Sequence, residues 1–271
     1  PKKRDRGLTV KKSPVEELAI KNNLDIYNPI KFNKNEITKF KNLKPDLVIV
    51  MAYGFLLPKE ILNYPLYGCI NIHVSLLPRW RGASPIEYAI LNGDKETGIT
   101  IFKLEKKLDS GPIISQKKII IEDSFNKELL INRLNFEGIN LLLLSLTNLF
   151  TNNVKYIEQD EKLSTYAKKI THLTTKIDFN KNTNEVLNKI KAFSPKPGAW
   201  FMYNNERIKI IEASISKGKY SPSVIINNKF HIGCLDGLIC PIIIQREGKK
   251  SMKIDDFLRG FKFCVGQKIN V

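Results

Sequence analysis

The sequence predicts an α/β fold with a doubly wound, mostly parallel, Rossmann-like sheet, followed by a small β-barrel of the OB type. Three observations support this prediction. In residues 1–150, apolar runs of strand length alternate with segments of helical spacing, which is typical of parallel α/β units. The polar segment 151–168 interrupts this alternation. Residues 169–271 then contain short strand-like runs separated by glycine turns, as small β-barrels do.

The elements of the first part can be placed in chain order. Three helices are expected to begin at capping residues or prolines, namely at Ser13-Pro14, at Ser84-Pro85 and at Asp123-Ser124, the last of them running to about residue 150. The predicted strands are 47–53, 69–74 and 98–104, and segment 112–121 is expected to be an edge or antiparallel strand. We expect residues 1–150 to form one domain and residues 151–168 to form a linker.

The second part is predicted to hold a helix, a series of short strands and a final helix. The expected helices are 184–193 and 254–259, and the strand-like runs are 200–204, 207–215, 229–234 and 238–245, with a last short strand near the end. We expect residues 169–271 to form the β-barrel domain. Barrels of this kind commonly hold nucleic acids.

Charge and composition limit the possible functions. The net charge is +17 and the pI is about 9.6, which would attract a polyanion, although a drift towards lysine-rich composition explains the charge equally well. The apolar run 139–150 is interrupted by polar residues, and the charged segment PKKRDRGLTVKK is not followed by the apolar stretch of a signal peptide. We therefore expect a cytoplasmic protein without a membrane span. Four cysteines without a C-x-x-C pair suggest buried thiols, and with only three histidines no metal centre is expected.

The segment NIHVSLLPRWRG, residues 71–82, places two polar side chains at the end of a predicted strand. Asn71 and His73 are two residues apart, so they share one face of that strand. In a parallel α/β sheet, the carboxyl ends of the strands are where ligands bind, and such a pair could hold a developing oxyanion. The alternative is a histidine satisfied by a backbone carbonyl and an asparagine that closes a loop.

A third polar residue, Asp109, lies in the glycine loop LDSGP directly after the predicted strand 98–104. Its position would bring a carboxylate back over the same edge of the sheet. A carboxylate close to His73 would raise the pKa of the imidazole above about 6.5 and favour the imidazolium. Taken alone, an Asp-Ser-Gly sequence is more often a simple turn.

Together, NIHVSLLPRWRG and LDSGP closely resemble the motifs of the folate-dependent formyltransferases. The resemblance extends along nearly the whole chain, through MAYGFLLPKEIL, FSPKPGAW and FLRGFKFCVGQKI. It implies an enzyme that transfers a formyl group from 10-formyltetrahydrofolate to the α-amino group of methionine on initiator tRNA. Asn71, His73 and Asp109 would be catalytic, with Asn71 and His73 stabilising the oxyanion and Asp109 orienting His73 and handling the amine proton.

The resemblance also implies binding residues. The folate site would be formed by Ser75, Leu76, Leu77 and Pro78, with residues 55–57 as further candidates for the pterin pocket. The tRNA would be bound by Arg4, Arg6, Lys11 and Lys12 in the basic segment at the start of the chain, and by the basic barrel. A solvated run of charges is the alternative interpretation of that segment. Arg79 and Arg81 could contact tRNA or brace the site through ion pairs, and Trp80 is expected to be a packing anchor.

Compared with that family, this sequence starts part of the way through the pattern. We expect that a strand, a helix and a second strand of the family are missing ahead of residue 1, which would leave the sheet N-terminally incomplete. A monomer is the default expectation. Two other functions remain open, namely a formyltransferase for a small amine, such as a nucleotide sugar or glycinamide ribonucleotide, and a decayed, non-catalytic tRNA-binding protein.

Overall fold

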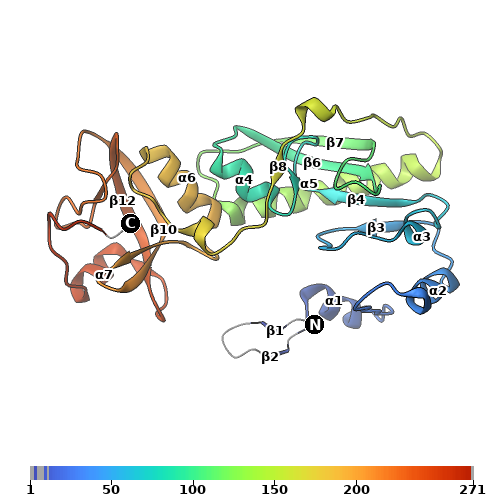
Figure 1. Ribbon diagram of the computed structural model, residues 1–271, viewed down its shortest axis with the longest axis horizontal. Coiled ribbons are helices and arrows are strands. Elements are labelled where there is room, and N and C mark those ends of the chain that lie inside the picture. The colour runs from blue at the N-terminus through green and yellow to red at the C-terminus, as the bar shows by residue number, and fades with distance from the viewer. Residues whose placement is uncertain (1–2, 5–8, 11, 270–271) are drawn as a thin grey trace.

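The computed structural model describes residues 3–4, 9–10 and 12–269, and it is elongated (Figure 1). An α/β unit and a β-rich unit lie at opposite ends of the long axis.

The helices are α1 (Pro14–Lys21), α2 (Lys34–Asn42), α3 (Lys59–Leu62), α4 (Pro85–Leu91), α5 (Lys127–Phe150), α6 (Thr183–Phe193) and α7 (Ile254–Gly260). The strands of the first part are β1 (Lys3–Arg4), β2 (Thr9–Val10), β3 (Val48–Val50), β4 (Cys69–His73), β5 (Arg81–Gly82), β6 (Glu96–Lys103), β7 (Ile113–Ile120) and β8 (Tyr166–Ala167).

The central sheet of the α/β unit has the strand order β3-β4-β6-β7. The α/β class is confirmed, and β7 is the antiparallel edge strand that the sequence predicts. The expectation of mostly parallel pairing holds for β3 and β4, whereas β6 is antiparallel to both of its neighbours in the described sheet. The connection from β4 to β6, residues 74–95 with α4 inside it, returns the chain to the end of the sheet at which β4 finishes. The chain therefore enters β6 at the end where it left β4.

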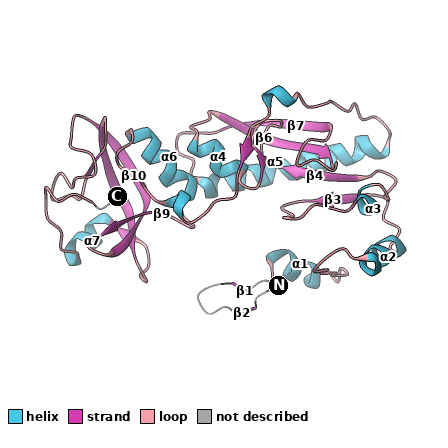
Figure 2. Ribbon diagram, in the orientation of Figure 1, coloured by secondary structure: helices cyan, strands magenta, loops and turns pink. Residues whose placement is uncertain are grey.

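Helix α5 lies along one face of this sheet (Figures 1 and 2). Its Leu130, Leu134 and Leu149 are buried, which explains why the apolar residues recur at helical spacing. The predicted start is three residues early, because the side chain of Asn126, rather than Asp123 or Ser124, caps the helix by accepting from the Leu129 amide. Among the described residues, α5 is also the one helix long and apolar enough to cross a membrane by length and composition.

Helix α1 begins as the sequence predicts. The Ser13 hydroxyl accepts from the Glu16 amide, and the Glu16 carboxylate accepts from the Ser13 amide, so the two residues form a capping box. Pro14 occupies the first turn of the helix.

The β-rich unit consists of antiparallel strands curled into part of a barrel. The strands are β9 (Ala199–Tyr203), β10 (Glu206–Lys217), β11 (Ile232–Gly233), β12 (Gly237–Arg246) and β13 (Met252–Lys253), in the order β11-β12-β10-β9 with β13 on β12. Aromatic and β-branched side chains, including Phe201, Tyr203 and Phe230, fill its core against α6 and α7. The last predicted strand is an isolated bridge between Val224 and Lys268.

Residues 156–167, which we call the strap, lie along the α/β unit, although the sequence predicts a linker there. Ile157 pairs with Ile113, and β8 at the end of the strap pairs in parallel with β5. Figure 2 shows this segment as a loop interrupted by one short helical turn, η1 (Glu161–Leu163). Both ends of the strap are therefore hydrogen-bonded to the α/β unit.

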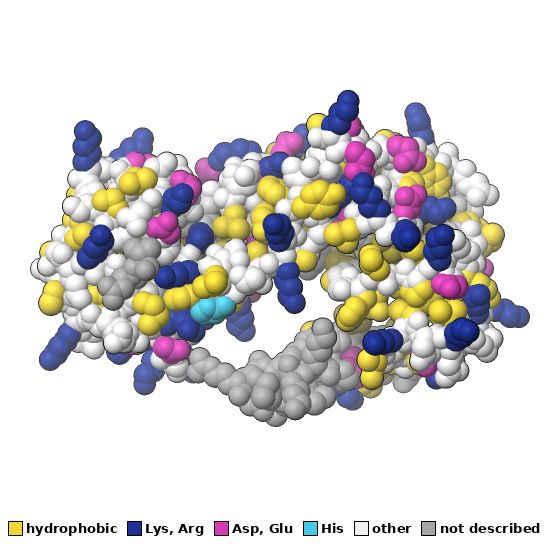
Figure 3. All heavy atoms as spheres, viewed as in Figure 1, with side chains coloured by type: hydrophobic (Ala, Val, Ile, Leu, Met, Phe, Trp, Pro, Cys, Tyr) yellow, Lys and Arg dark blue, Asp and Glu magenta, His cyan; other side chains and the backbone are white. Residues whose placement is uncertain are grey.

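The cysteine prediction holds for two of four residues. Cys69 and Cys234 are buried, whereas Cys240 is half-buried and Cys264 is exposed. Lysine and arginine side chains lie over both units on the face shown in Figure 3.

Candidate active site

A cavity of about 430 Å³ opens at the carboxyl end of β3 and β4. Strand β3 ends at Val50, three residues earlier than the sequence predicts, and the chain that follows leaves the sheet to form one wall. The lining residues are Met51, Ala52, Tyr53, Gly54, Phe55, Leu56, Asn71, Ile72, His73, Val74, Gly82, Ala83, Pro85, Leu108 and Asp109. The edge of the sheet thus forms a mainly apolar pocket with a few polar groups, the usual character of a small-molecule site.

Asn71, His73 and Asp109 all line this cavity. Asn71 and His73 come from β4, and Asp109 comes from the loop between β6 and β7. The imidazole Nδ1 of His73 lies 3.8 Å from Asp109 Oδ2, and both side chains are almost fully buried. The structure therefore brings together the three residues that the sequence singled out.

Burial controls the charge of His73. The pKa of the imidazole is lowered because desolvation disfavours the charged form, and this outweighs Asp109 and the Trp80 carbonyl, which both raise it. Asp109 does raise the pKa of His73, as expected, but burial outweighs it, so the net shift disfavours the imidazolium. Since Nε2 lies 2.8 Å from the Trp80 carbonyl oxygen, it must carry the proton that this acceptor binds. The neutral ring then has its lone pair on Nδ1, facing Asp109.

Asp109 is held in an uncommon backbone conformation. Its φ is 47°, in the left-handed region that few residues other than glycine adopt. The Gly82 amide donates to Asp109 Oδ2 at 2.7 Å, and the Gln159 side chain donates to the Asp109 carbonyl at 3.0 Å. The turn is thus fixed by partners from two distant segments.

Of the predicted folate residues 75–78, Ser75 and Leu77 are buried, Leu76 and Pro78 are half-buried, and none lines the cavity. The Ser75 hydroxyl donates to the Arg79 carbonyl at 2.6 Å, and Thr100 Oγ1 accepts from the Leu77 amide at 3.0 Å. Of the further candidates, Phe55 and Leu56 line the cavity. Sequence reasoning missed Gln159, because a glutamine in a polar segment gives no local signal of a structural role.

The two arginines beside Trp80 make ion pairs within the protein. Arg81 is fully buried, and its Nη1 donates to Glu161 Oε1 at 2.9 Å. Arg79 binds the Asp94 carboxylate through Nε and Nη2 at 2.9 and 2.6 Å, and Trp80 Nε1 donates to the same carboxylate at 2.7 Å. Of the two interpretations left open by the sequence, bracing agrees with these contacts, and Trp80 is part of the packing.

Of the four predicted tRNA-binding residues, only Lys12 has a side chain that the structure describes. Arg6 and Lys11 lie outside the described residues, and Arg4 is described only as part of β1. Lys12 is exposed.

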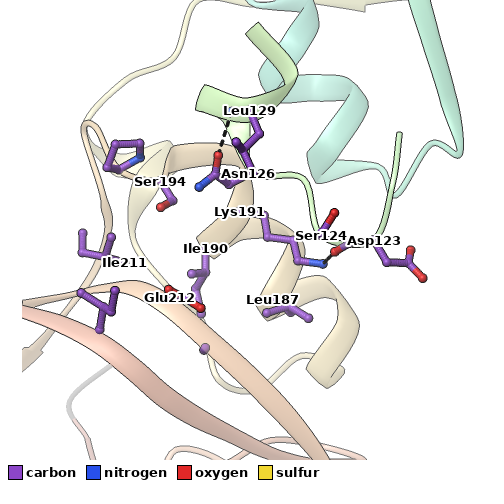
Figure 4. Close-up of a pocket in the computed structure, with 13 residues that line it drawn as sticks. Asp123, Ser124, Asn126, Leu129, Leu187, Ile190, Lys191, Ser194, Ile211 and Glu212 are labelled. Atoms are coloured by element: carbon purple, nitrogen blue, oxygen red, sulfur yellow. Dashed lines mark hydrogen bonds between the residues drawn. The ribbon is translucent and has the colours of Figure 1, made fainter. Parts of the chain in front are cut away.

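A second cavity, of about 460 Å³, lies between the start of α5, helix α6 and strand β10 (Figure 4). Two of its polar side chains have partners within the protein. Lys191 Nζ donates to the Asp123 carbonyl at 2.6 Å, and Asn126 caps α5. Unlike those at the end of β4, the described residues that line this slightly larger cavity include no histidine. Among the described residues there is no group of three or more His, Cys, Asp or Glu side chains that could hold a metal ion.

Comparison with known proteins points to one family. Residues 1–146 match the family described as formyl transferase, and residues 169–262 match the formyl transferase C-terminal domain. The methionyl-tRNA formyltransferase of Pelagibacter ubique is 40% identical over 99% of this chain and 88% of its own length.

Two solved structures share the fold. An N-formyltransferase from Helicobacter canadensis, in complex with folinic acid and dTDP-3-aminofucose, superposes with a TM-score of 0.66 at 20% identity over 91% of this chain and 87% of its own. The methionyl-tRNA formyltransferase of Clostridium thermocellum superposes with a TM-score of 0.55 at 21% identity over 76% of this chain and 89% of its own.

Proposed function

The chain belongs to the formyl transferase family, and within it to the methionyl-tRNA formyltransferases; from this premise we propose that it transfers a formyl group from 10-formyltetrahydrofolate to the α-amino group of initiator methionyl-tRNA. The observation that carries the proposal is the convergence of Asn71, His73 and Asp109 on one cavity at the end of β4. Fold alone would not identify the reaction, because one fold can host many chemistries.

The cavity suits a formyl-carrying folate. When bound, this donor supplies the formyl carbon that the amine attacks. Apolar side chains such as Phe55, Leu56 and Val74 can cover the faces of a flat ring, while backbone groups at the end of the strand can bind its polar edge. We assign residues 75–78 to the folate site because they directly continue the segment from Asn71 to Val74, which lines the cavity.

Asn71 is the residue we assign to the formyl oxygen. Its side chain is half-buried and lines the cavity, and its amide group can donate two hydrogen bonds. Negative charge develops on the formyl oxygen as the amine attacks, and a donor fixed by a strand stabilises that charge with little reorganisation.

His73 and Asp109 are suited to handling the proton of the amine. The neutral imidazole has its lone pair on Nδ1, which can accept the amine proton as the new carbon–nitrogen bond forms. The same proton can then pass to N10 of the donor as the bond between N10 and the formyl carbon breaks and tetrahydrofolate leaves. The resulting imidazolium would lie beside Asp109, whose Oδ2 is 3.8 Å from Nδ1 before any proton moves. Asp109 thus stabilises the charge that His73 acquires.

Recognition of tRNA is assigned mainly to the basic second part of the chain. From Lys155 to Val271 there are 21 basic and 11 acidic residues, a net charge of +10. Positive surfaces bind phosphate backbones without reading sequence. We assign catalysis to residues 1–150, tRNA binding to residues 169–271 together with Arg4, Arg6, Lys11 and Lys12, and the connection to residues 151–168. We place the activity in the cytoplasm, with the protein a monomer.

Labelled formyl transfer tests the proposal. The protein, 10-formyltetrahydrofolate carrying a labelled formyl group and initiator methionyl-tRNA should give label on the tRNA. A dTDP-amino sugar and glycinamide ribonucleotide are the matched small-amine acceptors. Label on a small amine alone would overturn the tRNA assignment, and tRNA binding without any transfer would identify a non-catalytic binding protein.

A further inference from the structure

Gln159 lies in the strap and uses every hydrogen-bonding position of its side-chain amide. Its Nε2 donates to the carbonyl oxygens of Asp109 at 3.0 Å and Gly111 at 2.8 Å. Its Oε1 accepts from Arg81 Nε at 3.1 Å and from Arg81 Nη2 at 2.8 Å. A primary amide offers two donors on nitrogen and two acceptor lone pairs on oxygen, so this set of partners fixes its orientation.

The contacts of Gln159 reach both sides of the Asp109 carboxylate. The two carbonyl oxygens belong to the turn that carries Asp109. Arg81 immediately precedes Gly82, whose amide donates to Asp109 Oδ2 at 2.7 Å. One side chain therefore fixes the backbone of the turn and the segment that supplies the carboxylate's hydrogen-bond donor.

Glu161, also in the strap, strengthens the same arrangement. Its Oε1 accepts from Arg81 Nη1 at 2.9 Å, and its Oε2 accepts from Lys107 Nζ at 2.6 Å. Lys107 is two residues before Asp109, so the strap contacts the turn on both sides of the aspartate. The two strap residues bind the turn in different ways. Glu161 forms an ion pair with Lys107, whereas the uncharged amide of Gln159 donates to backbone carbonyls.

We propose that Gln159 is a positioning residue that sets the place of Asp109 beside His73, an inference that rests on the proposed formyl transfer. The turn needs such support because Asp109 has a φ of 47°, a conformation that persists where surrounding contacts determine it. Gln159 is absent from the lining of the cavity, so it acts through Asp109 and does not contact a substrate there. A displacement of about 1 Å at a reacting group can cost about 100-fold in rate.

The test compares two substitutions with a neighbouring control. Gln159→Glu has the same size and keeps acceptors for Arg81, but its carboxylate cannot donate to the two carbonyls. Gln159→Leu removes all four hydrogen bonds. Glu158→Ala is the matched control, because Glu158 is exposed on the same segment. We expect both Gln159 variants to lower kcat about 10- to 100-fold with KM for methionyl-tRNA within about twofold of the wild type.

A second readout separates positioning from a loss of folding. The Gly82 amide, which donates to Asp109, should exchange with solvent faster in Gln159→Glu than in the wild type, at a melting temperature close to that of the wild type. A wild-type kcat in Gln159→Glu, or unchanged Gly82 exchange, would overturn the inference. If wild type and Glu158→Ala also fail to formylate methionyl-tRNA, then the proposed function fails, and Gly82 exchange still decides whether Gln159 positions the turn.

Discussion

At the scale of single residues, the position of His73 follows from the sequence, whereas its charge does not. Strand periodicity alone predicts that Asn71 and His73 share a face, and both line the cavity. The sign of the pKa shift depends on how deeply the ring is buried. That depth is set by residues distant in sequence, such as Phe102, whose ring lies edge-on to the imidazole with centroids 6.4 Å apart.

The pKa of His73 gives the first prediction. Because burial lowers it, we expect the imidazole to titrate below the ordinary value of about 6.5, as measured by NMR of the ring. Linkage fixes the sign for stability. As the pH falls, the unfolded chain protonates His73 at a higher pH than the folded chain does. The free energy of unfolding should therefore fall as the pH drops below about 6.5.

Urea unfolding at pH 7.5 and pH 5.5 checks the second half of this prediction. The wild type should lose more stability on acidification than His73→Gln, which has no proton to bind at that position. A titration midpoint above 6.5, or equal pH dependence in the two proteins, would contradict burial as the controlling effect.

At the scale of elements, long periodic segments are predicted well and short non-local pairs are not. Helix α5 and strands β4, β6 and β7 are recognisable from their apolar patterns. Strands β5 and β8 have two residues each, which is too short to show a periodic pattern. They also pair across some 85 positions of the chain, so no local signal predicts the pairing. A polar composition predicted a linker there, because composition does not reveal a side chain such as Gln159 that bonds to a distant turn.

Gly82 tests the importance of this pair. It has a φ of +112°, and a Cβ there would lie 2.7 Å from the Ala167 carbonyl oxygen in β8. We expect Gly82→Ala to reduce the free energy of unfolding by about 1–3 kcal/mol, as for other strained backbone positions, and to lower kcat by displacing the amide that donates to Asp109.

The control for this prediction is Gly260→Ala, because a Cβ at Gly260 would have no heavy atom within 4 Å. Denaturant unfolding and formyl-transfer kinetics should show the control close to the wild type. Full activity in a stable Gly82→Ala protein would show that the β5–β8 pair does not hold the Asp109 turn.

At the scale of the whole molecule, the order of the two units follows from the change in pattern along the chain, while their junction does not. Helix α6 packs against both units. Its Ala192 is buried in the cluster that contains Ile90 of α4, while its Ile190 and Phe193 are buried in the core of the β-rich unit. Such a shared core depends on how the two parts of the chain pack against each other. It cannot be predicted from sequence patterns, because these describe each part alone.

The charge of the whole chain gives a prediction about tRNA. With a net charge of +17, binding should release counterions from the phosphates, so the association constant for tRNA should fall with salt. Six phosphate contacts would correspond to a loss of about 1,000-fold between 50 and 200 mM salt. Filter binding or fluorescence anisotropy over this range measures the slope. An association constant that does not change with salt would show that the basic surface does not bind the tRNA phosphates.

The central claim is that Asn71, His73 and Asp109 perform formyl transfer to methionyl-tRNA. Its most direct test is single-turnover transfer of labelled formyl, with tRNA affinity measured alongside, for the wild type and for Asn71→Ala, His73→Ala and Asp109→Ala. Since a single hydrogen-bond donor or proton acceptor commonly contributes a factor of about 100 or more, we expect each variant to lose at least that much in rate while binding tRNA normally. A variant that transfers the formyl group at the wild-type rate would contradict the account of this site.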